Sequence, residues 1–242
     1  MSSGTGPVGS QACPVATATD QNGNPVAGVR VDFTVTGANP TTGFAYTGSN
    51  GQAQFCYTGA TSGSDTIVAA VQSIQSPPAT WVWTKTATTL TTTLSGNEQT
   101  GTAITVPAGT AVTDTATLAG ANAATATGTV SYNLYSDSAC TDLVAAAGGG
   151  AVTAGAVPSS SAEILSNPGT YYWTASYSGD GANQPSTSSC GAETATVPPT
   201  TTTTTLSTSL SGGGASGASI TVPSSTAITD QSILQAQVAR RA

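Results

Sequence analysis

The sequence repeats itself at a constant spacing, and this repeat constrains the fold more than any other feature. Four positions return 116 residues later with the same residue: Leu90 as Leu206, Ile104 as Ile220, Asp114 as Asp230 and Leu118 as Leu234. The matched stretch needs no gap, which indicates a tandem array of one structural unit. The later copy stops matching after Leu234, and residues 235–242 are too few to complete it.

We expect the 242 residues to form two complete modules and part of a third, because domains usually contain about 100–150 residues. The predicted divisions are a disordered N-terminus at 1–10, a first module at 11–87, a second module at 88–199 and an incomplete third repeat at 200–242. The connectors between the modules are rich in β-branched residues and proline. Such composition favours short, extended, semi-rigid links.

Composition favours strands over helices and over disorder. Only 6% of the residues are Asp, Glu, Lys or Arg, against about 25% in an average domain. Thr and Val favour strands, whereas Gly and Pro interrupt them. Because 38% of the residues are hydrophobic and stand in alternating runs, they can bury a core. The predicted fold class is therefore all-β.

The charge pattern disfavours nucleic acid and membranes as partners. The net charge is -7, and the basic residues are Arg30, Lys85, Arg240 and Arg241. This leaves no basic surface for phosphate backbones or anionic lipid. No apolar stretch approaches the roughly 20 residues that span a bilayer, so we expect no membrane insertion. Residues 1–10 lack the regions of a secretory signal.

The first module shows the period of a strand with one buried face. Val29, Val31, Phe33 and Val35 alternate with polar residues, and Asn22-Gly23 suits a tight turn. Several short motifs follow one another in the order typical of group 1 bacterial immunoglobulin-like domains of the invasin and intimin type: Asp20–Pro25 with Gly28-Val29, Asn50–Gly59, Gly63–Ala70 and Trp81–Trp83. The resemblance covers about residues 11–86. It implies a β-sandwich with a spacer or adhesin-stalk role.

The second module has two predicted strands with clear buried faces. One places Val130, Tyr132 and Leu134 on one side, and the other begins at Gly169-Thr170-Tyr171, where a tyrosine corner would place Trp173 in the core. The segment Ser176–Asp180 followed by Asn183 resembles immunoglobulin-like repeats of large actinobacterial surface proteins. The whole chain is thus predicted to be a series of tandem immunoglobulin-like β-sandwiches.

The four cysteines fall two to each complete module. The chain has no His and no Cys-x-x-Cys spacing, so a mixed Cys/His metal site is impossible and nothing suggests a zinc or redox centre. We predict the disulfides Cys13–Cys56 and Cys140–Cys190, with reduced buried thiols as the alternative. Disulfides imply an oxidising compartment outside the cytoplasm.

We predict no enzyme, no catalytic residue and no cofactor. The absence of His excludes a His-dependent nucleophile triad, and Lys85 as the sole lysine leaves little scope for lysine chemistry. The glycine runs at 148–150 and 212–214 lack the Lys-Ser/Thr of a phosphate loop. A carboxylate pair of the glycosidase kind stays open, because the sequence singles out no pair.

Three features have both a chemical and a structural interpretation. Asp20–Asn24 and Asp180 could belong to calcium loops, but the distal Glu is missing and Asx turns are favoured. Lys85 could form an isopeptide bond with an Asn or Asp of the first module. Four aromatic residues could stack on sugars, although core packing is favoured for residues two apart on a strand: Trp81, Trp83, Tyr171 and Trp173.

The leading functional hypothesis is a non-catalytic structural and adhesive array, which serves as a stalk or spacer. Its possible partners are a cell-surface protein, a glycan or neighbouring immunoglobulin-like repeats. The expected location is extracellular or on the cell surface, with the export signal encoded outside this chain. The alternatives are a phage virion appendage at the virion surface, and a carbohydrate-binding accessory module of a secreted hydrolase.

Overall fold

A computed structural model describes residues 1–200, 202–212, 215–217 and 229–238. In this part of the chain nearly all regular structure is β, with one short 3-10 turn at Ala123–Thr125, so the all-β prediction is confirmed. The chain divides into two compact units, Met1–Val197 and Pro198–Ala242. The first unit contains two separate hydrophobic cores, which define module 1 (β1 to β10) and module 2 (β11 to β20).

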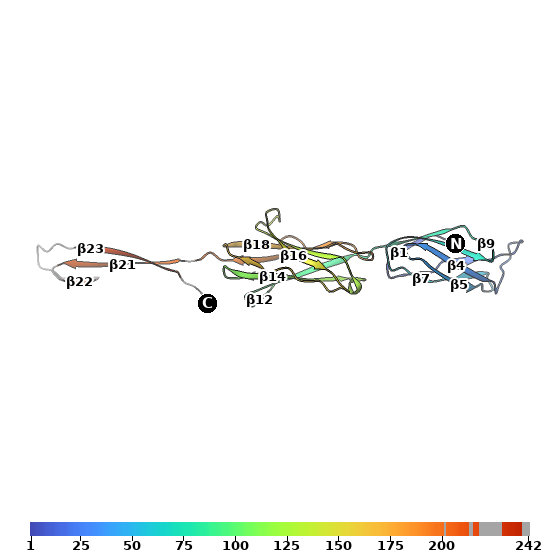
Figure 1. Cartoon of the computed structure of the whole chain (residues 1–242), viewed down its shortest axis with the longest axis horizontal. Coiled ribbons are helices and arrows are strands. Elements are labelled where there is room, and N and C mark those ends of the chain that lie inside the picture. The colour runs from blue at the N-terminus through green and yellow to red at the C-terminus, as the bar shows by residue number, and fades with distance from the viewer. Residues whose placement is uncertain (201, 213–214, 218–228, 239–242) are drawn as a thin grey trace. The chain divides into compact units, whose positions relative to one another are not determined.

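Module 1 is built on one large sheet that faces two short strand pairs (Figure 1). The large sheet has the order β1 (Gly4–Pro7), β10 (Ala79–Thr84), β8 (Gly63–Val71), β4 (Arg30–Gly37) and β5 (Thr41–Tyr46), with β9 (Ile74–Gln75) beside β8. The short pairs are β2 (Gln11–Ala12) with β7 (Tyr57–Thr58), and β3 (Val15–Thr17) with β6 (Gln52–Gln54). Val31, Phe33 and Val35 of β4 are buried, as their alternation predicted.

The prediction of a disordered N-terminus at residues 1–10 is wrong. β1 pairs in parallel with β10, so that Gly4 lies opposite Trp81, and Val8 is buried in the module 1 core. The absence of a side chain at Gly4 permits this pairing, because a Cβ there would collide with the indole ring of Trp81. Glycine, which in sequence suggests a flexible end, is here the residue that lets a strand pass close to a large ring.

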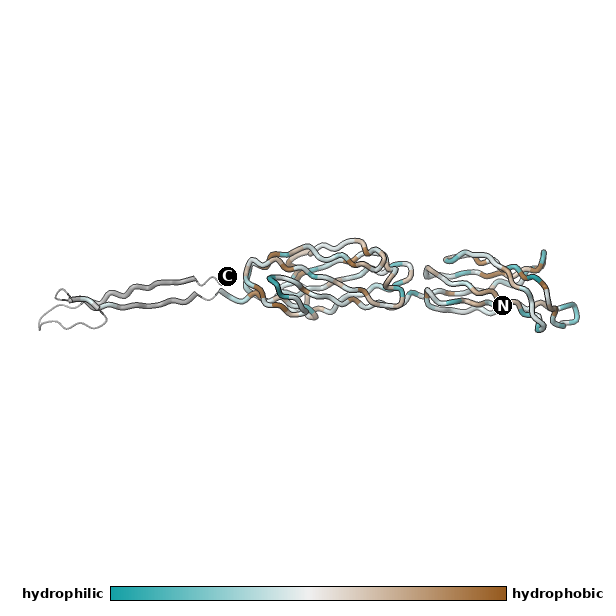
Figure 2. Tube along the Cα trace, turned by 90° about the horizontal axis from the view of Figure 1, so that it is seen from below, coloured by the Kyte–Doolittle hydropathy of each residue, from teal (hydrophilic) through white to brown (hydrophobic). Residues whose placement is uncertain are grey.

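Module 2 is a two-sheet sandwich. One sheet has the order β12 (Gln99–Gly101), β11 (Thr88–Gly96), β14 (Thr110–Gly120) and β17 (Glu163–Leu165). The other has β13 (Ala103–Thr105), β20 (Glu193–Val197), β18 (Gly169–Tyr177), β15 (Thr129–Tyr135) and β16 (Leu143–Ala151), with β19 (Ser186–Thr187) beside β18. The two sheets enclose the second core, and apolar and polar segments alternate along their strands (Figure 2).

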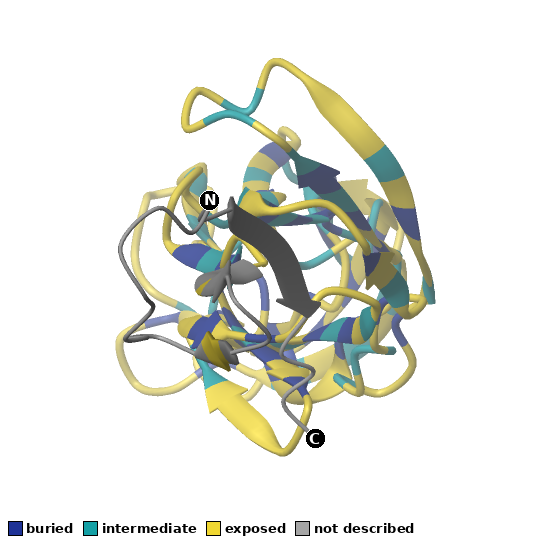
Figure 3. Cartoon of the chain, turned by 90° about the vertical axis from the view of Figure 1, so that its left-hand side faces the viewer, coloured by how far each residue is buried: buried dark blue, intermediate teal, exposed yellow. Residues whose placement is uncertain are grey.

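Buried and exposed residues also alternate along the strands of the sandwiches (Figure 3). In module 2, Tyr132, Leu134 and Trp173 are fully buried, as predicted. The Tyr171 hydroxyl donates to the carbonyl of Asn167 at 3.0 Å, the bond expected of a tyrosine corner. The predicted interior faces of both strands are therefore correct.

The second unit contains a three-stranded sheet with the order β22 (Ala215–Gly217), β21 (Thr202–Gly212) and β23 (Thr229–Val238). Its register repeats that of module 2: Leu210 pairs with Asp230 and with Gly217, as Leu94 pairs with Asp114 and with Gly101. The backbone pairing of β12-β11-β14 thus returns at the offset found in the sequence.

Candidate functional site

Each module contains one disulfide. Cys13–Cys56 has an S–S distance of 2.05 Å and a sequence separation of 43, and it joins the β2–β3 connection to the β6–β7 connection. Cys140–Cys190 has an S–S distance of 1.98 Å and a separation of 50, and it joins the β15–β16 loop to the turn before β20. The chain has no free cysteine. Both cross-links close long loops, so they restrict the unfolded chain considerably.

The connector between the two modules is hydrogen-bonded to a loop of module 2. The Thr86 N–H donates to the Ala182 carbonyl at 2.9 Å, and the Gln184 N–H donates to the Thr86 carbonyl at 2.8 Å. The Thr88 hydroxyl donates to the carbonyl of Gln184 at 2.8 Å. The connector therefore forms an added strand-like pairing instead of a free hinge.

Further contacts of this junction come from both modules. The Asn122 side-chain amide donates to the Val8 carbonyl at 3.2 Å and to the Thr86 hydroxyl at 3.1 Å. The Ser62 N–H donates to the Gly181 carbonyl at 2.8 Å, and Ala182 packs against the module 1 core. Module 2 thus contacts the end of module 1 through two separate segments.

Asp180 fixes the module 2 loop that makes these contacts. Its carboxylate accepts from the backbone N–H groups of Thr127 (2.8 Å), Ala182 (2.8 Å) and Asn183 (2.7 Å), and from the Tyr177 hydroxyl (3.1 Å). Burial acts to raise the pKa of Asp180, but these hydrogen bonds outweigh it and hold the pKa well below its usual range. This is the Asx-type turn that the sequence favoured over a calcium loop.

The turn at Asp20 is of the same kind. Its Oδ1 accepts from the N–H groups of Asn22 at 2.8 Å and Asn24 at 2.9 Å, and these hydrogen bonds lower the pKa of the carboxyl. Among the described residues no group of three or more His, Cys, Asp or Glu is placed to hold a metal ion. The described residues also include no helix that is long and apolar enough to cross a membrane.

The tryptophans and Tyr171 are core residues and do not form a sugar-stacking platform. Trp83, Trp173 and Tyr171 are buried, and the half-buried Trp81 packs over the glycines of β1. The side chain of Lys85, the isopeptide candidate, is exposed to solvent. The packing interpretation of the aromatic residues is therefore correct.

A different aromatic pair is exposed, and the sequence interpretation missed it. Phe44 and Tyr46 of β5 are 53% and 61% exposed, with ring centroids 6.0 Å apart in an edge-to-face arrangement. The Arg30 guanidinium lies 4.3 Å from the Phe44 ring centroid and forms an ion pair with Asp32 at 2.8 Å. We call these four residues the β5 face. The spacing of Phe44 and Tyr46, two residues apart, was the feature of the sequence that could have indicated this exposed pair.

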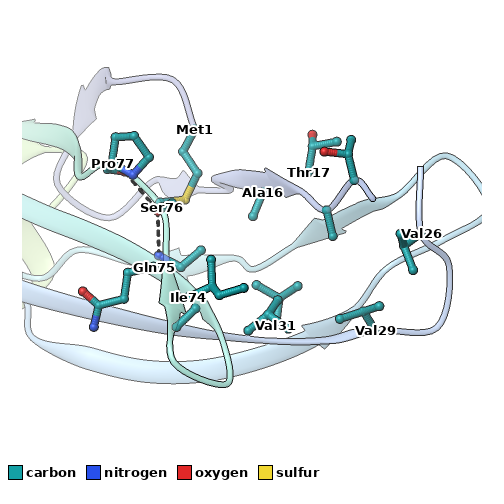
Figure 4. Close-up of a pocket in the computed structure, with 15 residues that line it drawn as sticks. Met1, Ala16, Thr17, Val26, Val29, Val31, Ile74, Gln75, Ser76 and Pro77 are labelled. Atoms are coloured by element: carbon teal, nitrogen blue, oxygen red, sulfur yellow. Dashed lines mark hydrogen bonds between the residues drawn. The ribbon is translucent and has the colours of Figure 1, made fainter. Parts of the chain in front are cut away.

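Module 1 also has an apolar hollow at one end (Figure 4). Its volume is about 500 Å³, and its walls include Met1, Ala16, Val26, Val31 and Ile74. No charged side chain lines it. The hollow therefore offers little to orient a polar ligand.

Each module buries acidic side chains beside its tryptophan. In module 1 the Asp65 carboxylate accepts from the Trp83 indole N–H at 2.7 Å, the Tyr57 hydroxyl at 3.1 Å and the Asn39 N–H at 2.8 Å. In module 2 the carboxylate oxygens of Asp114 and Glu193 accept no hydrogen bond. Both residues are buried, so a substrate could not reach them. Asp114 and Glu193 therefore do not form a carboxylate pair of the glycosidase kind.

The core environment raises the pKa of both buried carboxyl groups of module 2. Burial raises the pKa of Asp114 to about 6. Burial, followed by the charge of Asp114, raises the pKa of Glu193 to about 8. Two carboxyl groups that meet away from water favour retention of a proton.

The comparisons with solved structures give several immunoglobulin-like tandem proteins. Invasin, a bacterial integrin-binding protein, is 18% identical over 95% of this chain and 57% of that chain, with a TM-score of 0.46. A C-terminal 282-residue fragment of intimin, in complex with the intimin-binding domain of the translocated intimin receptor, is 18% identical over 80% of this chain and 60% of that chain, with a TM-score of 0.28. FdeC, an Escherichia coli adhesin, is 17% identical over 76% of this chain and 60% of that chain, with a TM-score of 0.30.

The chain thus spans less than two thirds of the length of each of these structures, and no curated protein matches it. The resemblance of module 2 to actinobacterial repeats stays a prediction. A family model, the bacterial Ig-like domain (group 1), matches residues 9–83. This range contains Cys13–Cys56 and the strands from β2 to β9 with most of β10, in agreement with the order of motifs in the sequence. The family match therefore agrees with the resemblance of the first module to group 1 bacterial immunoglobulin-like domains.

Proposed function

We propose that the chain is a non-catalytic array of immunoglobulin-like modules that acts as a stalk or spacer in a secreted or surface-displayed protein. The observation that supports this role is the hydrogen-bonded junction around Thr86. A spacer must keep its modules from pivoting freely, and modules of one chain usually move unless their interface holds them. The pairing of the connector with residues 182–184 meets that need.

The rigidity of the junction is tested by NMR alignment tensors measured separately for the two modules of the full chain. The wild-type modules are expected to share one tensor. A variant that carries Asn122→Ala and Asn183→Ala removes side-chain contacts of the junction and should give two tensors. Ser131→Ala, an exposed change in β15, is the matched control and should keep one tensor. Two independent tensors in the wild-type chain would refute a rigid spacer.

We propose that residues 200–242 belong to a third repeat, as the register of β21, β22 and β23 supports. We further propose an extracellular or cell-surface location, with a phage virion surface as the alternative. The two disulfides support an oxidising compartment. Non-reducing mass analysis after alkylation of material from such a compartment should find no alkylated thiol, and four alkylated thiols would contradict this location.

A second candidate function is adhesion through the β5 face, and a protein partner suits it better than a glycan. Arg30 covers a face of the Phe44 ring, and the Phe44 and Tyr46 rings stand nearly perpendicular at 86°. They form no flat platform for a sugar. Exposed Tyr46 on the edge strand β5 and exposed Arg30 on the neighbouring strand β4 are instead residue types that are enriched in protein-binding hot spots.

The adhesive role is tested with beads coated with the full chain and applied to cells. Phe44→Ser with Tyr46→Ser should abolish adhesion, whereas Ile74→Ser, which removes another exposed apolar side chain of module 1, should not. Treatment of the cells with protease should prevent adhesion, and treatment with glycosidases should not. Adhesion that survives the double substitution would reject the β5 face as the binding surface.

A further inference from the structure

Module 2 brings two carboxyl groups together across its core. Asp114 lies in the middle of β14 in one sheet, and Glu193 begins β20 in the facing sheet. Their residues are 0% and 1% exposed, and Asp114 lies close enough to Glu193 to act on its ionisation. The pair therefore bridges the two sheets of the sandwich out of contact with water.

The groups that surround the pair do not satisfy its four oxygen atoms. The Tyr132 hydroxyl of β15 donates to the Pro158 carbonyl at 2.8 Å, so its proton is committed elsewhere. Trp173 lies opposite Glu193 in the β18–β20 register, but its indole N–H has no acceptor. The Thr92 hydroxyl of β11 favours ionised Glu193, and the backbone of Thr93 and Thr115 favours ionised Asp114, but none of these groups makes a hydrogen bond to the two carboxylates.

Among the residues that the structure describes, no positive charge forms an ion pair with either acid. In the described part of the chain the single ion pair is Arg30 with Asp32, which belongs to module 1. Two ionised carboxylates with acceptors only would face each other without a donor in a dry core, which is strongly unfavourable. One proton changes this balance, because it converts one carboxyl into a donor for the other.

We propose that Asp114 and Glu193 share one proton in the folded chain, and that the resulting O–H···O⁻ hydrogen bond ties the two sheets of module 2 together. No cofactor or oxidant is involved, since the proton comes from solvent on folding and returns to it on unfolding. The position of Asp114 is also repeated: Asp230 pairs with Leu210 as Asp114 pairs with Leu94. In a chain with only 11 acidic residues, this recurrence supports a structural task for the acid.

The shared proton makes module 2 sensitive to alkali. In the unfolded chain both carboxyl groups lose their protons near pH 4. The folded pair keeps one proton until the pH approaches the raised pKa of Glu193, about 8. The stabilisation is thus complete below about pH 4 and is lost as the pH rises through about 8. Between pH 6 and 8, where the folded pair holds one proton and the unfolded chain none, each pH unit favours unfolding by about tenfold.

The test uses the full chain labelled with 5-fluorotryptophan and denatured with urea at a series of pH values. The 19F signal of Trp173 reports module 2, and the signal of Trp83 reports module 1 in the same sample. The unfolding constant of module 2 should rise by about tenfold per pH unit between pH 6 and 8, where the folded pair holds one proton. Glu193→Gln should remove this slope, whereas Glu163→Gln on β17 should leave it unchanged.

A second measurement uses the wild-type chain alone and so does not require that a variant folds. In wild-type chain with 13C-labelled carboxyl groups, one buried carboxyl signal at pH 7 should show the shift of a shared proton. Full ionisation of every carboxyl group at pH 7, or a pH-independent module 2, would overturn the proposal. An intact mass lower by one water than that of the chain with two disulfides would also overturn the proposal, because a carboxyl group would then be consumed in a covalent bond. If Glu193→Gln does not fold, the carboxyl signal decides alone.

Discussion

Module 1 and module 2 bury an acid and a tryptophan in the same kind of sandwich, but they satisfy these groups in opposite ways. In module 1 the Asp65 carboxylate receives the Trp83 indole N–H at 2.7 Å. In module 2 the Trp173 indole N–H has no acceptor, although Glu193 lies opposite in the register. A buried acid is thus compatible with this fold either through hydrogen-bond donors or, as we propose for module 2, through a retained proton.

The difference follows from which strands supply donors. Asp65 on β8 accepts hydrogen bonds from Trp83 of β10, Tyr57 of β7 and the loop residue Asn39, so donors from three segments satisfy it. Asp114 on β14 faces a second acid instead. Module 1 should therefore depend on the hydrogen bonds that its buried acid accepts, whereas module 2 should depend on its buried proton.

The largest expected effect concerns the disulfides, in which the two modules are alike. Replacement of both cysteines of either pair by Ser should lower the unfolding free energy of that module by about 4 kcal/mol, because loops of similar length are closed. Urea unfolding of each double variant measures this loss. A loss in one module less than half of that in the other would break the similarity.

The second effect separates the modules. Asp65→Asn should destabilise module 1 by about 3 kcal/mol, because an amide cannot accept from Trp83, Tyr57 and Asn39 together and a buried donor is left without a partner. Asp114→Asn should change module 2 by less than about 1 kcal/mol at pH 7, since the amide N–H can donate to Glu193 in place of the shared proton. Equal losses in the two urea titrations would contradict the comparison.

The same substitution at the two tryptophans sharpens the contrast. Trp83→Phe and Trp173→Phe remove similar volumes from buried positions. Only the first also removes a hydrogen bond to a carboxylate, so its cost should exceed that of the second by about 2 kcal/mol. Thermal unfolding of the two variants measures the difference, and a larger loss at Trp173 would refute it.

The smallest effect is a pH dependence of opposite sign at the junction. Because the pKa of Asp180 is lowered on folding, its contribution is present above the usual pKa of an aspartate and is lost as the pH falls. Asp180→Asn should cost about 1 kcal/mol at pH 7 and less at pH 3. Hydrogen exchange of residues 177–184 at the two pH values, corrected for the intrinsic rate, measures this change. A cost that is the same at pH 3 would contradict the role of the charge.

Much of the fold was predictable because it depends on local periodicity. The alternation in β4, the buried face at Trp173 and the repeat at 116 residues all express side-chain patterns that any strand of that sequence would present. The N-terminus was predicted wrongly for the same reason. Gly4 and Gly6 carry no pattern, and only the ring of Trp81, far away in sequence, gives them a partner.

The candidate site was less predictable. The β5 face combines residues from two strands, and nothing in the order of the chain places Arg30 over Phe44. The junction likewise joins Thr86 to residues 182–184, which are almost a hundred positions later. Such contacts depend on how the sheets pack, which single-strand patterns do not contain.

The sequence by itself determined the all-β class, the tandem repeat, the group 1 resemblance and the scarcity of charge, because each is a property of composition or spacing. Only the tertiary structure decided which acids meet donors and which meet each other. Asp65, Asp114 and Glu193 are each an isolated acidic residue in the sequence, and their different hydrogen bonding arises from strands that pack across the core. The ionisation of a buried group depends on its neighbours in space, and these are set by the packing of the two sheets.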